Sequence, residues 1–298
     1  MELRNLKTFV TIAKGGSFTK AADILGYAQS TITTQIKVLE SQLNTKLFDR
    51  LGRNIFLTSD GEKLLKYAEQ ILKLSSEAEN VVGMSEITKG TLTIGAVESL
   101  CVIRLPGILK KYHELYPKVD IIIKLATDSN LRSYLKNNTI DVAIFLGKEV
   151  YDEELISKTK FYEPMVVLSS PSHIISKLKS ITADNLSSES FILNEKGCSY
   201  CTMFESMLNK AGVYPKSILE VGSIQAIKQF TINNLGITFL PRMAVEKELK
   251  DGQLVELNWH GPDLNVMSQV MYHKDRWISP AMKAFLDLIH GLQDEKLN

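Results

Sequence analysis

A row of short polar side chains lies among apolar residues in the stretch GSFTKAADILGYAQSTITTQIKVLE, residues 16–40. The row runs Gln29-Ser30-Thr31 and Thr33-Thr34-Gln35, and such side chains hydrogen-bond to base edges and phosphates. From Ile32 to Leu43, apolar residues recur four, three and four positions apart, which predicts one helix with a single buried face. The side chains that we expect this helix to present to DNA are Gln29, Ser30, Thr31, Thr33, Thr34 and Lys37.

Two shorter helices are predicted before this one. Apolar residues recur at helical spacing from Leu3 to Ala13, and Gly15-Gly16 ends that helix. Ser17 is placed to cap the second helix, and Gly26 ends it with a left-handed turn. A helix, a short helix, a turn and a longer helix form the helix-turn-helix arrangement, which reads the major groove with the first residues of its last helix.

The segment KLFDRLGRNIFLT, residues 46–58, predicts a β-hairpin wing after this unit. Arg50 and Arg53 lie near its tip and would contact the DNA backbone or minor groove, which positions a protein without reading sequence. Two alternatives stay open at this point. Arg50 can instead brace the wing by pairing with an acidic residue, and the polar row can be an ordinary solvated helix face.

Charge and composition are those of a soluble globular protein with a modest basic excess at its N-terminal end, which is either an ordinary solvated surface or, beside a nucleic-acid groove, a binding surface. Residues 1–58 hold eight Lys and Arg against four Asp and Glu, while the whole chain of 298 residues carries a net charge of +1. The 44% apolar and 23% charged residues are typical of a globular protein of two or three domains. No apolar run approaches the ~20 residues of a membrane span. The N-terminus lacks the apolar core of a signal peptide, so we expect a cytoplasmic protein.

A long helix is predicted next. Thr58 or Ser59 caps it, Glu62 completes a capping box, and the helix extends to about Ile87. Apolar and small residues then alternate four and three apart, which predicts a seam for a partner helix and a short dimer contact. The seam consists of Leu64, Ala68, Ile71, Ser75, Ala78 and Val82.

From Thr91 onward the pattern changes to an α/β fold. Short runs rich in β-branched residues, such as TLTIGAV and DVAIFLG, alternate with helical segments such as LPGILKKYHELYP. This alternation predicts parallel βαβ units arranged in two small lobes, with one more strand and helix near the end of the chain. Ligands of such folds bind between the lobes, at the carboxyl ends of strands and the N-termini of helices.

Loops after these strands supply the predicted ligand site between the lobes. Ser99 and Ser199 lie at predicted helix N-termini, where they suit a small anion or act as N-caps. Glu98 disfavours an anionic effector and favours a cationic or neutral one, unless it pairs with a lysine such as Lys196. The predicted contacts are Glu98, Ser99, Leu100, Cys101, Thr127, Asp128, Cys198, Ser199, Tyr200, Cys201, Thr202 and Ser223.

Three cysteines in a chain of this length do not form a disulfide framework. Cys198 and Cys201 form a C-x-x-C at the predicted cleft, and Cys101 is expected on its opposite lip. Thiols of low pKa at a helix N-terminus are reactive, so a redox switch or a thiol-bound metal is an alternative to ordinary buried cysteines. One C-x-x-C lacks the second pair of a structural zinc site, and we predict no metal and no cofactor.

These fragments together resemble the LysR-type transcriptional regulators. Thr33, where the family usually has Ser, and Glu98, where a small or polar residue is expected, are departures from its pattern. The match covers nearly the whole chain at the family's intervals. Its fragments are L-x-x-F at Leu6, GSFTKAA at Gly16, Q-S-x-x-T-x-Q-I at Gln29, LE at Leu39, LFDR at Leu47, LT-x-x-G at Leu57, GTLTIG at Gly90, IDVAI at Ile140 and LGITFLP at Leu235.

The resemblance implies a division of the chain into three parts. Residues 1–58 would form a winged helix-turn-helix, 59–89 a linker and dimerisation helix, and 90–298 an effector domain similar to type 2 periplasmic binding proteins. Lobe I would comprise about 90–161 and 266–298, and lobe II about 162–265. The resemblance also implies a homotetramer, built on a dimer through the linker helix, that bends double-stranded promoter DNA in response to a small-molecule effector.

Two functions of other classes compete with this one. An enzyme of two-lobed α/β fold would use the same architecture, but the chain has no Gly-rich phosphate loop or Ser-His-Asp constellation in view. A ligand-binding protein whose helix-turn-helix makes only protein contacts is the third hypothesis. We predict a DNA-binding regulator without catalysis and without a membrane partner.

Overall fold

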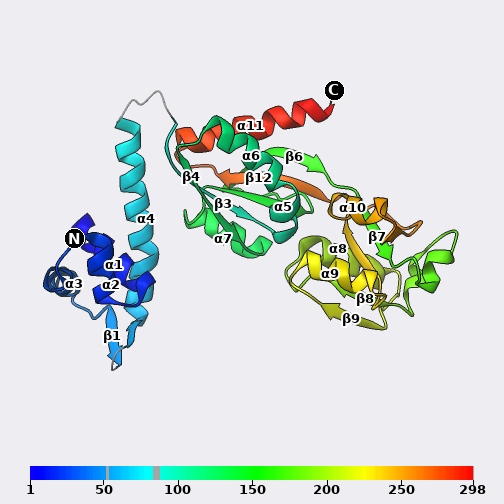
Figure 1. Cartoon of the computed structure of the whole chain (residues 1–298), viewed down its shortest axis with the longest axis horizontal. Helices are drawn as coiled ribbons and strands as arrows, with labels where there is room; N and C mark the ends of the chain where they lie inside the picture. The colour runs from blue at the N-terminus through cyan, green and yellow to red at the C-terminus, as the bar shows by residue number, and fades with distance from the viewer. Residues whose placement is uncertain (52–53, 83–87, 298) are drawn as a thin grey trace. The chain divides into compact units, whose positions relative to one another are not determined.

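The computed structural model describes residues 1–51, 54–82 and 88–297, and it divides into two compact units, Met1–Glu86 and Ile87–Asn298 (Figure 1). Each unit has its own hydrophobic core. No helix in the described part of the chain is long and apolar enough to cross a bilayer.

The first unit is a winged helix-turn-helix followed by a long helix, as the sequence predicts. The short helices end at left-handed glycines, Gly16 with φ of 62° and Gly26 with φ of 68°. The Ser17 side chain accepts a hydrogen bond from Lys20 N and so caps the second helix. The elements are α1 (Leu3–Gly15), α2 (Phe18–Leu25), α3 (Gln29–Leu43), the antiparallel hairpin of β1 (Phe48–Leu51) and β2 (Asn54–Leu57), and α4 (Ser59–Val82).

The core of this unit holds α3 by one face. Ile32, Ile36 and Leu39 are buried against Leu6 and Phe9 of α1. Leu43, which the spacing assigns to the same stripe, remains 38% exposed because α3 ends there and extends beyond the core.

One member of the polar row is not on the solvent side. Gln35 is buried, and its Oε1 accepts a hydrogen bond of 2.5 Å from Thr8 Oγ1 of α1. This buried hydrogen bond joins α3 to α1 and satisfies the Gln35 carbonyl oxygen inside the core. The exposed row is therefore shorter than the sequence implies.

The start of α4 differs from the prediction in one detail. Thr58 is the N-cap, because its Oγ1 accepts a hydrogen bond of 3.0 Å from Gly61 N. The third residue of the helix is therefore Gly61 and not Glu62, so the predicted capping box is wrong. Thr58 N instead donates to the Leu47 carbonyl, which joins the helix to the wing.

The predicted partner seam on α4 is partly used within the chain. Ala68 is fully buried in the first unit's core, and Leu64 and Ile71 pack against it. A four-three spacing identifies a helix face that is covered, but it does not identify what covers it. The exposed apolar side chains of α4 lie on another face, with Tyr67 65% and Leu74 59% exposed. Residues 83–87, to which the predicted helix extends, lie outside the described part.

The second unit is the predicted two-lobed α/β domain. Its first sheet has the strand order β4-β3-β5-β12-β6, in which β3 pairs in parallel with β4 and β5, and β12 pairs antiparallel with β5 and β6. The strands are β3 (Gly90–Ala96), β4 (Val119–Leu125), β5 (Val142–Gly147), β6 (Leu155–Tyr162) and β12 (Met267–His273), and the helices are α5 (Glu98–Ile103), α6 (Leu105–Leu115), α7 (Asp128–Lys136) and α11 (Pro280–Leu297).

Strand β5 is buried on both faces, and helices cover each of them (Figure 1). Ile144 points into the core formed with α6 and α11, while Phe145 points into a second core formed with α7. The two cores together make lobe I a three-layered structure.

Lobe II repeats this plan on a smaller scale. The antiparallel sheet β10-β7-β11 is joined to the parallel pair β8–β9 by a bridge between Phe191 and Ile237. Its elements are β7 (Met165–Ser169), η1 (Ile174–Lys177), η2 (Ala183–Leu186), β8 (Ser190–Leu193), α8 (Ser199–Lys210), β9 (Ser217–Glu220), α9 (Ile224–Ile232), β10 (Thr238–Pro241), η3 (Arg242–Ala244), α10 (Glu246–Lys250) and β11 (Val255–Glu256).

Strand β6 was not predicted, and in the first sheet the pairs of β12 with β5 and β6 depart from the predicted parallel pattern. Strands β6 and β12 carry the chain between the lobes, where Glu163 N donates to the Val266 carbonyl at 2.9 Å. Glu163 is buried, pairs with Arg104 and accepts a hydrogen bond of 2.6 Å from Ser268 Oγ. The crossing point is therefore held by a buried ion pair and not by apolar packing alone.

The junction of wing and α4 generates a prediction about Gly61. A Cβ at this position would overlap the Leu47 carbonyl oxygen, so Gly61→Ala should destabilise the first unit by about 1–3 kcal/mol. At Gly15 nothing lies within 4 Å of the added atom, and Gly15→Ala should be neutral or slightly stabilising. Hydrogen exchange of α1 and α3 peptides in the full-length protein measures both. Equal protection in the two variants would contradict the close approach.

Candidate functional site

The N-terminal half of α3 exposes a continuous polar face. Gln29, Ser30, Thr31, Thr34 and Lys37 are exposed. Thr33 is partly exposed beside them. The face is positioned by the buried side of the same helix, so its side chains project from a rigid element.

The threonine hydroxyls on this face have a fixed orientation. Thr33 Oγ1 donates to the Gln29 carbonyl and Thr34 Oγ1 donates to the Ser30 carbonyl, each at 2.9 Å. Because the hydroxyl hydrogen is used within the helix, each threonine side chain keeps oxygen lone pairs as acceptors and a methyl group for apolar contact. Such a side chain accepts a hydrogen bond from an exocyclic amine or packs on a thymine methyl.

The beginning of α3 suits a phosphate. Its N-cap residue is Ala28, which makes no side-chain capping bond. The first-turn N–H groups of a helix attract anions when no side chain caps them, and Ser30 and Thr31 are exposed beside them.

The wing is present, but its two arginines are only partly described. Arg50 lies in β1 opposite Ile55 of β2. Arg53 lies outside the described residues.

Glu40 is a positioning residue that the chemistry of the polar row did not single out. Its Oε1 accepts a hydrogen bond of 2.9 Å from Leu47 N, and its Oε2 pairs with Lys46 at 3.1 Å. These contacts connect α3 to the start of the wing. The Leu39-Glu40 pair was visible in the sequence, but its partner at Leu47 is a tertiary contact.

In the second unit, Glu98 connects the lobes. Its Oε1 and Oε2 lie 3.3 and 3.2 Å from Ile224 N, the first amide of α9 in lobe II. Burial raises the pKa of this carboxyl, while the Ile224 N–H and the charge of Lys228 lower it. Lys196 was named as a possible partner of Glu98, but the lysine whose charge acts on this carboxyl is Lys228. That ammonium is itself paired with Glu248 at 2.7 Å.

Asp128 is the second acid at the contact between lobes. It is the first residue of α7 and only 8% exposed. Burial raises the pKa of its carboxyl to about 6, while the charge of Arg132 and a hydrogen bond with Ser199 lower it. Its Oδ1 is buried and has no hydrogen-bond partner.

Two glycines allow the lobes to meet here. A Cβ on Gly147, at the end of β5, would overlap Ser199 Oγ and lie 3.7 Å from Asp128 Oδ2. Gly197 has φ of 100°, and a Cβ there would lie 3.0 Å from Thr127 Cγ2. Thr127 and Asp128 of lobe I are thus brought against residues 197–199 of lobe II, as the sequence predicts.

Other predicted contacts lie behind this surface. Ser99, Leu100, Tyr200 and Cys201 are buried. Thr202 is exposed and its Oγ1 donates to the Cys198 carbonyl. Ser223 is the N-cap of α9 but makes no capping bond.

Cys198 and Cys101 do not have the low pKa that a reactive thiol requires. Cys198 Sγ donates to Cys201 Sγ at 2.6 Å, and both are free thiols. Burial raises the pKa of Cys198, and burial with the charge of Glu98 raises that of Cys101. Across the described ranges, no three His, Cys, Asp or Glu side chains gather as a metal ion would require.

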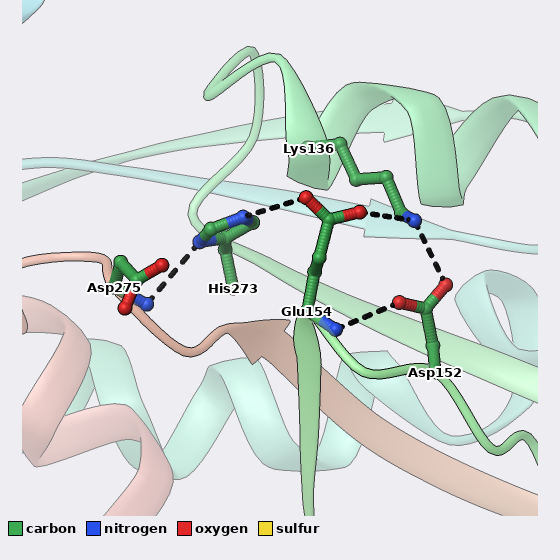
Figure 2. Close-up of polar contacts among 5 residues, drawn as sticks. All are labelled: Lys136, Asp152, Glu154, His273 and Asp275. Atoms are coloured by element: carbon green, nitrogen blue, oxygen red, sulfur yellow. Dashed lines mark hydrogen bonds and ion pairs between the residues drawn. The ribbon is translucent and has the colours of Figure 1, made fainter.

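A polar cluster lies at the other end of α7 (Figure 2). Lys136, which ends the helix, pairs with Asp152 at 3.1 Å and with Glu154 at 2.6 Å. His273, the last residue of β12, lies 4.0 Å from Glu154. These partly exposed pairs contribute little energy individually, but they connect the C-terminus of α7 to the segment before β6. The N-terminus of α7 is the end that carries Asp128.

Two family profiles match the chain. The bacterial regulatory helix-turn-helix of the lysR family matches residues 3–62, and the LysR substrate binding domain matches residues 85–293. The chain belongs to the LysR family of transcriptional regulators. Its first unit thus carries the family's DNA-binding helix-turn-helix, and its second unit is the family's effector-binding domain.

Relatives and solved structures agree with this assignment. The HTH-type transcriptional regulators YwqM and GltR of Bacillus subtilis strain 168 are 38% and 33% identical to it, over 97% and 96% of this chain and 98% and 95% of theirs. Full-length CbnR in complex with its target DNA superposes with a TM-score of 0.73 at 20% identity, over 98% of this chain and 99% of CbnR. A full-length OxyR variant from Pseudomonas aeruginosa superposes with a TM-score of 0.72 at 22% identity, over 97% of this chain and 95% of OxyR.

The LysR assignment confirms the predicted fold class and the predicted class of function. The chain is a DNA-binding transcriptional regulator with an effector domain, and the two-lobed α/β fold is that of full-length LysR regulators. The two Bacillus relatives named above are HTH-type transcriptional regulators.

The raised pKa of Asp128 predicts a pH-dependent stability. A carboxyl whose pKa is higher in the folded state makes unfolding harder as the pH falls from about 7 toward 4, because the folded state binds the additional proton. Asp128→Asn removes this dependence and should be more stable than wild type at pH 7.5 by on the order of 2 kcal/mol. The difference should shrink to nearly zero at pH 4.5.

Urea unfolding of the full-length protein between pH 4.5 and 7.5 measures this difference. Asp120→Asn, at an exposed position of the same lobe, is the matched control and should follow wild type at each pH. A difference between Asp128→Asn and wild type that is the same at all pH values would refute the assignment.

Proposed function

We propose that α3 enters the major groove and reads promoter DNA with the exposed face described above. Gln29 pairs with a base edge, and Thr33 and Thr34 accept hydrogen bonds or contact thymine methyl groups. Ser30, Thr31 and Lys37 contact phosphates, as do Arg50 and Arg53 on the wing. The observation that carries this proposal is the exposed polar face of α3, which the buried Ile32, Ile36 and Leu39 hold in place.

The base-reading and phosphate-binding roles have different signatures in a binding experiment. Gln29→Ala should weaken binding to a selected target sequence by about 1–3 kcal/mol and leave binding to random DNA unchanged. Lys37→Ala should weaken binding to both and reduce the salt slope by about 1. Fluorescence anisotropy with fragments selected by the wild-type protein from a random library measures both effects at several salt concentrations.

Matched controls come from exposed positions in the second unit. Gln229→Ala and Lys110→Ala make the same changes of side chain away from α3 and should bind as wild type does. Wild-type affinity and specificity in both Gln29→Ala and Lys37→Ala would rule out this assignment of the DNA face.

The protein is proposed to act as a homodimer through α4 and to assemble into a homotetramer. Support comes from the apolar side chains that α4 exposes, Tyr67 and Leu74, seven residues apart on one face with Ala78 next to them. The edge strands β4 and β9 add exposed apolar residues, including Leu125 and Leu219, as further candidate contacts.

Leu74→Glu should therefore weaken self-association at least about tenfold, because it places a charge in the middle of an apolar contact. The control is Ile174→Glu, which makes a comparable change at an exposed position of lobe II. Sedimentation velocity over a range of protein concentrations reports the assembly. A Leu74→Glu protein with the wild-type distribution would show that α4 pairs through other residues or not at all.

The effector is proposed to bind between the lobes and to alter promoter binding and bending. The side chains that support this site are Glu98, Cys101, Thr127, Asp128, Cys198, Ser199, Thr202 and Ser223, with Ser99, Leu100, Tyr200 and Cys201 packed behind them. The proposed division of the chain is 1–58 for DNA binding, 59–89 for dimerisation and 90–298 for effector binding. We place the protein in the cytoplasm and expect it to act by binding, without catalysis and without a cofactor.

A further inference from the structure

The N-terminus of α9 already holds a carboxylate of this chain. Helix N-termini are where the lobes of such folds hold anionic groups, because the first N–H groups are free to bind them. Here both oxygens of Glu98 in lobe I lie within 3.3 Å of Ile224 N in lobe II. An anionic effector at this position would have to displace Glu98.

Asp128 lies at a second helix N-terminus and has unused capacity to accept a hydrogen bond. Ser199, the first residue of α8, lies beside it across the lobe contact. The Asp128 side chain is more than nine-tenths buried, and its Oδ1 has no hydrogen-bond partner. A buried carboxylate oxygen without a partner is costly, and a native structure rarely keeps one unless a ligand or water satisfies it.

The cations near these two acids do not neutralise them fully. Lys228 lies near Glu98, but its ammonium pairs with Glu248 and donates to the Ala244 carbonyl. Arg132 lies one turn after Asp128 on α7 and acts on it by its charge, yet Asp128 Oδ1 remains without a hydrogen bond. The contact between the lobes is therefore suited to a positive group rather than to a negative one.

We propose that the effector of this protein carries an ammonium group, and that Asp128 Oδ1 accepts its hydrogen bond when the lobes close on it. Glu98 excludes anionic competitors by occupying the N-terminus of α9. Charge-assisted hydrogen bonds of this kind are strongest where water is excluded, which is the environment of Asp128. The inference rests on the proposed function, in which the effector binds between the lobes.

Small compounds of matched carbon skeleton provide the first test. n-Butylammonium, 1,4-diaminobutane and 2-phenylethylammonium are titrated into the full-length protein, each beside the carboxylate of the same skeleton. At least one ammonium compound should raise the thermal unfolding midpoint, and its carboxylate counterpart should not. Asp128→Asn should weaken the binding measured by calorimetry at least tenfold, whereas Asp120→Asn should change it less than twofold.

A second variant tests the role of Glu98 independently of Asp128. Glu98→Ala leaves the N-terminus of α9 without its carboxylate, so butyrate should raise the unfolding midpoint of this variant and not of wild type. The result for Glu98→Ala can be interpreted even if Asp128→Asn folds poorly. Butyrate that stabilises wild type and Glu98→Ala equally would overturn the exclusion of anions.

The remaining outcomes separate this inference from the proposed function. If carboxylates or neutral compounds shift the wild-type midpoint and ammonium compounds do not, the inference is wrong while an effector site remains. If no compound of any class shifts it, or if ammonium compounds bind Asp128→Asn as tightly as wild type, the inference is also wrong. The proposed effector site itself fails if substitutions at Ser199 and Thr127 leave effector-dependent promoter binding unchanged in cell extracts that contain the inducer.

Discussion

The burial of β5 on both faces is the constraint from which the effector domain follows. Its six residues have no exposed side, so helices must cover the sheet from above and below. Ile144 and Phe145 direct their side chains into these two separate cores. The strand then ends at Gly147, where the absence of a side chain lets Ser199 of the second lobe approach the backbone. The same strand thus orders the layers and locates the contact between the lobes.

The lobe contact combines two opposing electrostatic arrangements. Glu98 lies on the N-terminus of α9, where the helix dipole and an N–H group favour a negative charge. Asp128 lies where burial disfavours a negative charge, and the pKa of its carboxyl is raised for that reason. One acid therefore helps to hold the lobes together, while the other keeps an unsatisfied oxygen at their contact. This difference arises from the surroundings and not from the residue type, since both side chains are carboxylates.

In the first unit, the four-three spacing of apolar residues on α4 is compatible with a partner helix and with packing inside the same chain. The four-three spacing on α4 predicts a covered face, and Ala68 is indeed covered, but by the helix-turn-helix core of its own chain. Tyr67 and Leu74, which remain exposed and lie seven residues apart, were not part of the predicted seam. The spacing of apolar residues shows which face of a helix is buried. It does not show which other surface packs against that face.

The amino-acid sequence by itself determined the local features of this regulator: the helix ends at Gly16 and Gly26, most of the polar face of α3, the alternation of strands with helices, and the family. These depend on neighbours in the chain, whose spacing is visible in one dimension. Only the tertiary structure decided that Gln35 is buried with Thr8, that β6 and β12 cross antiparallel between the lobes, and that Glu98 meets α9. Such contacts join residues 27 to 126 positions apart, and their energies depend on burial and geometry that no local pattern encodes.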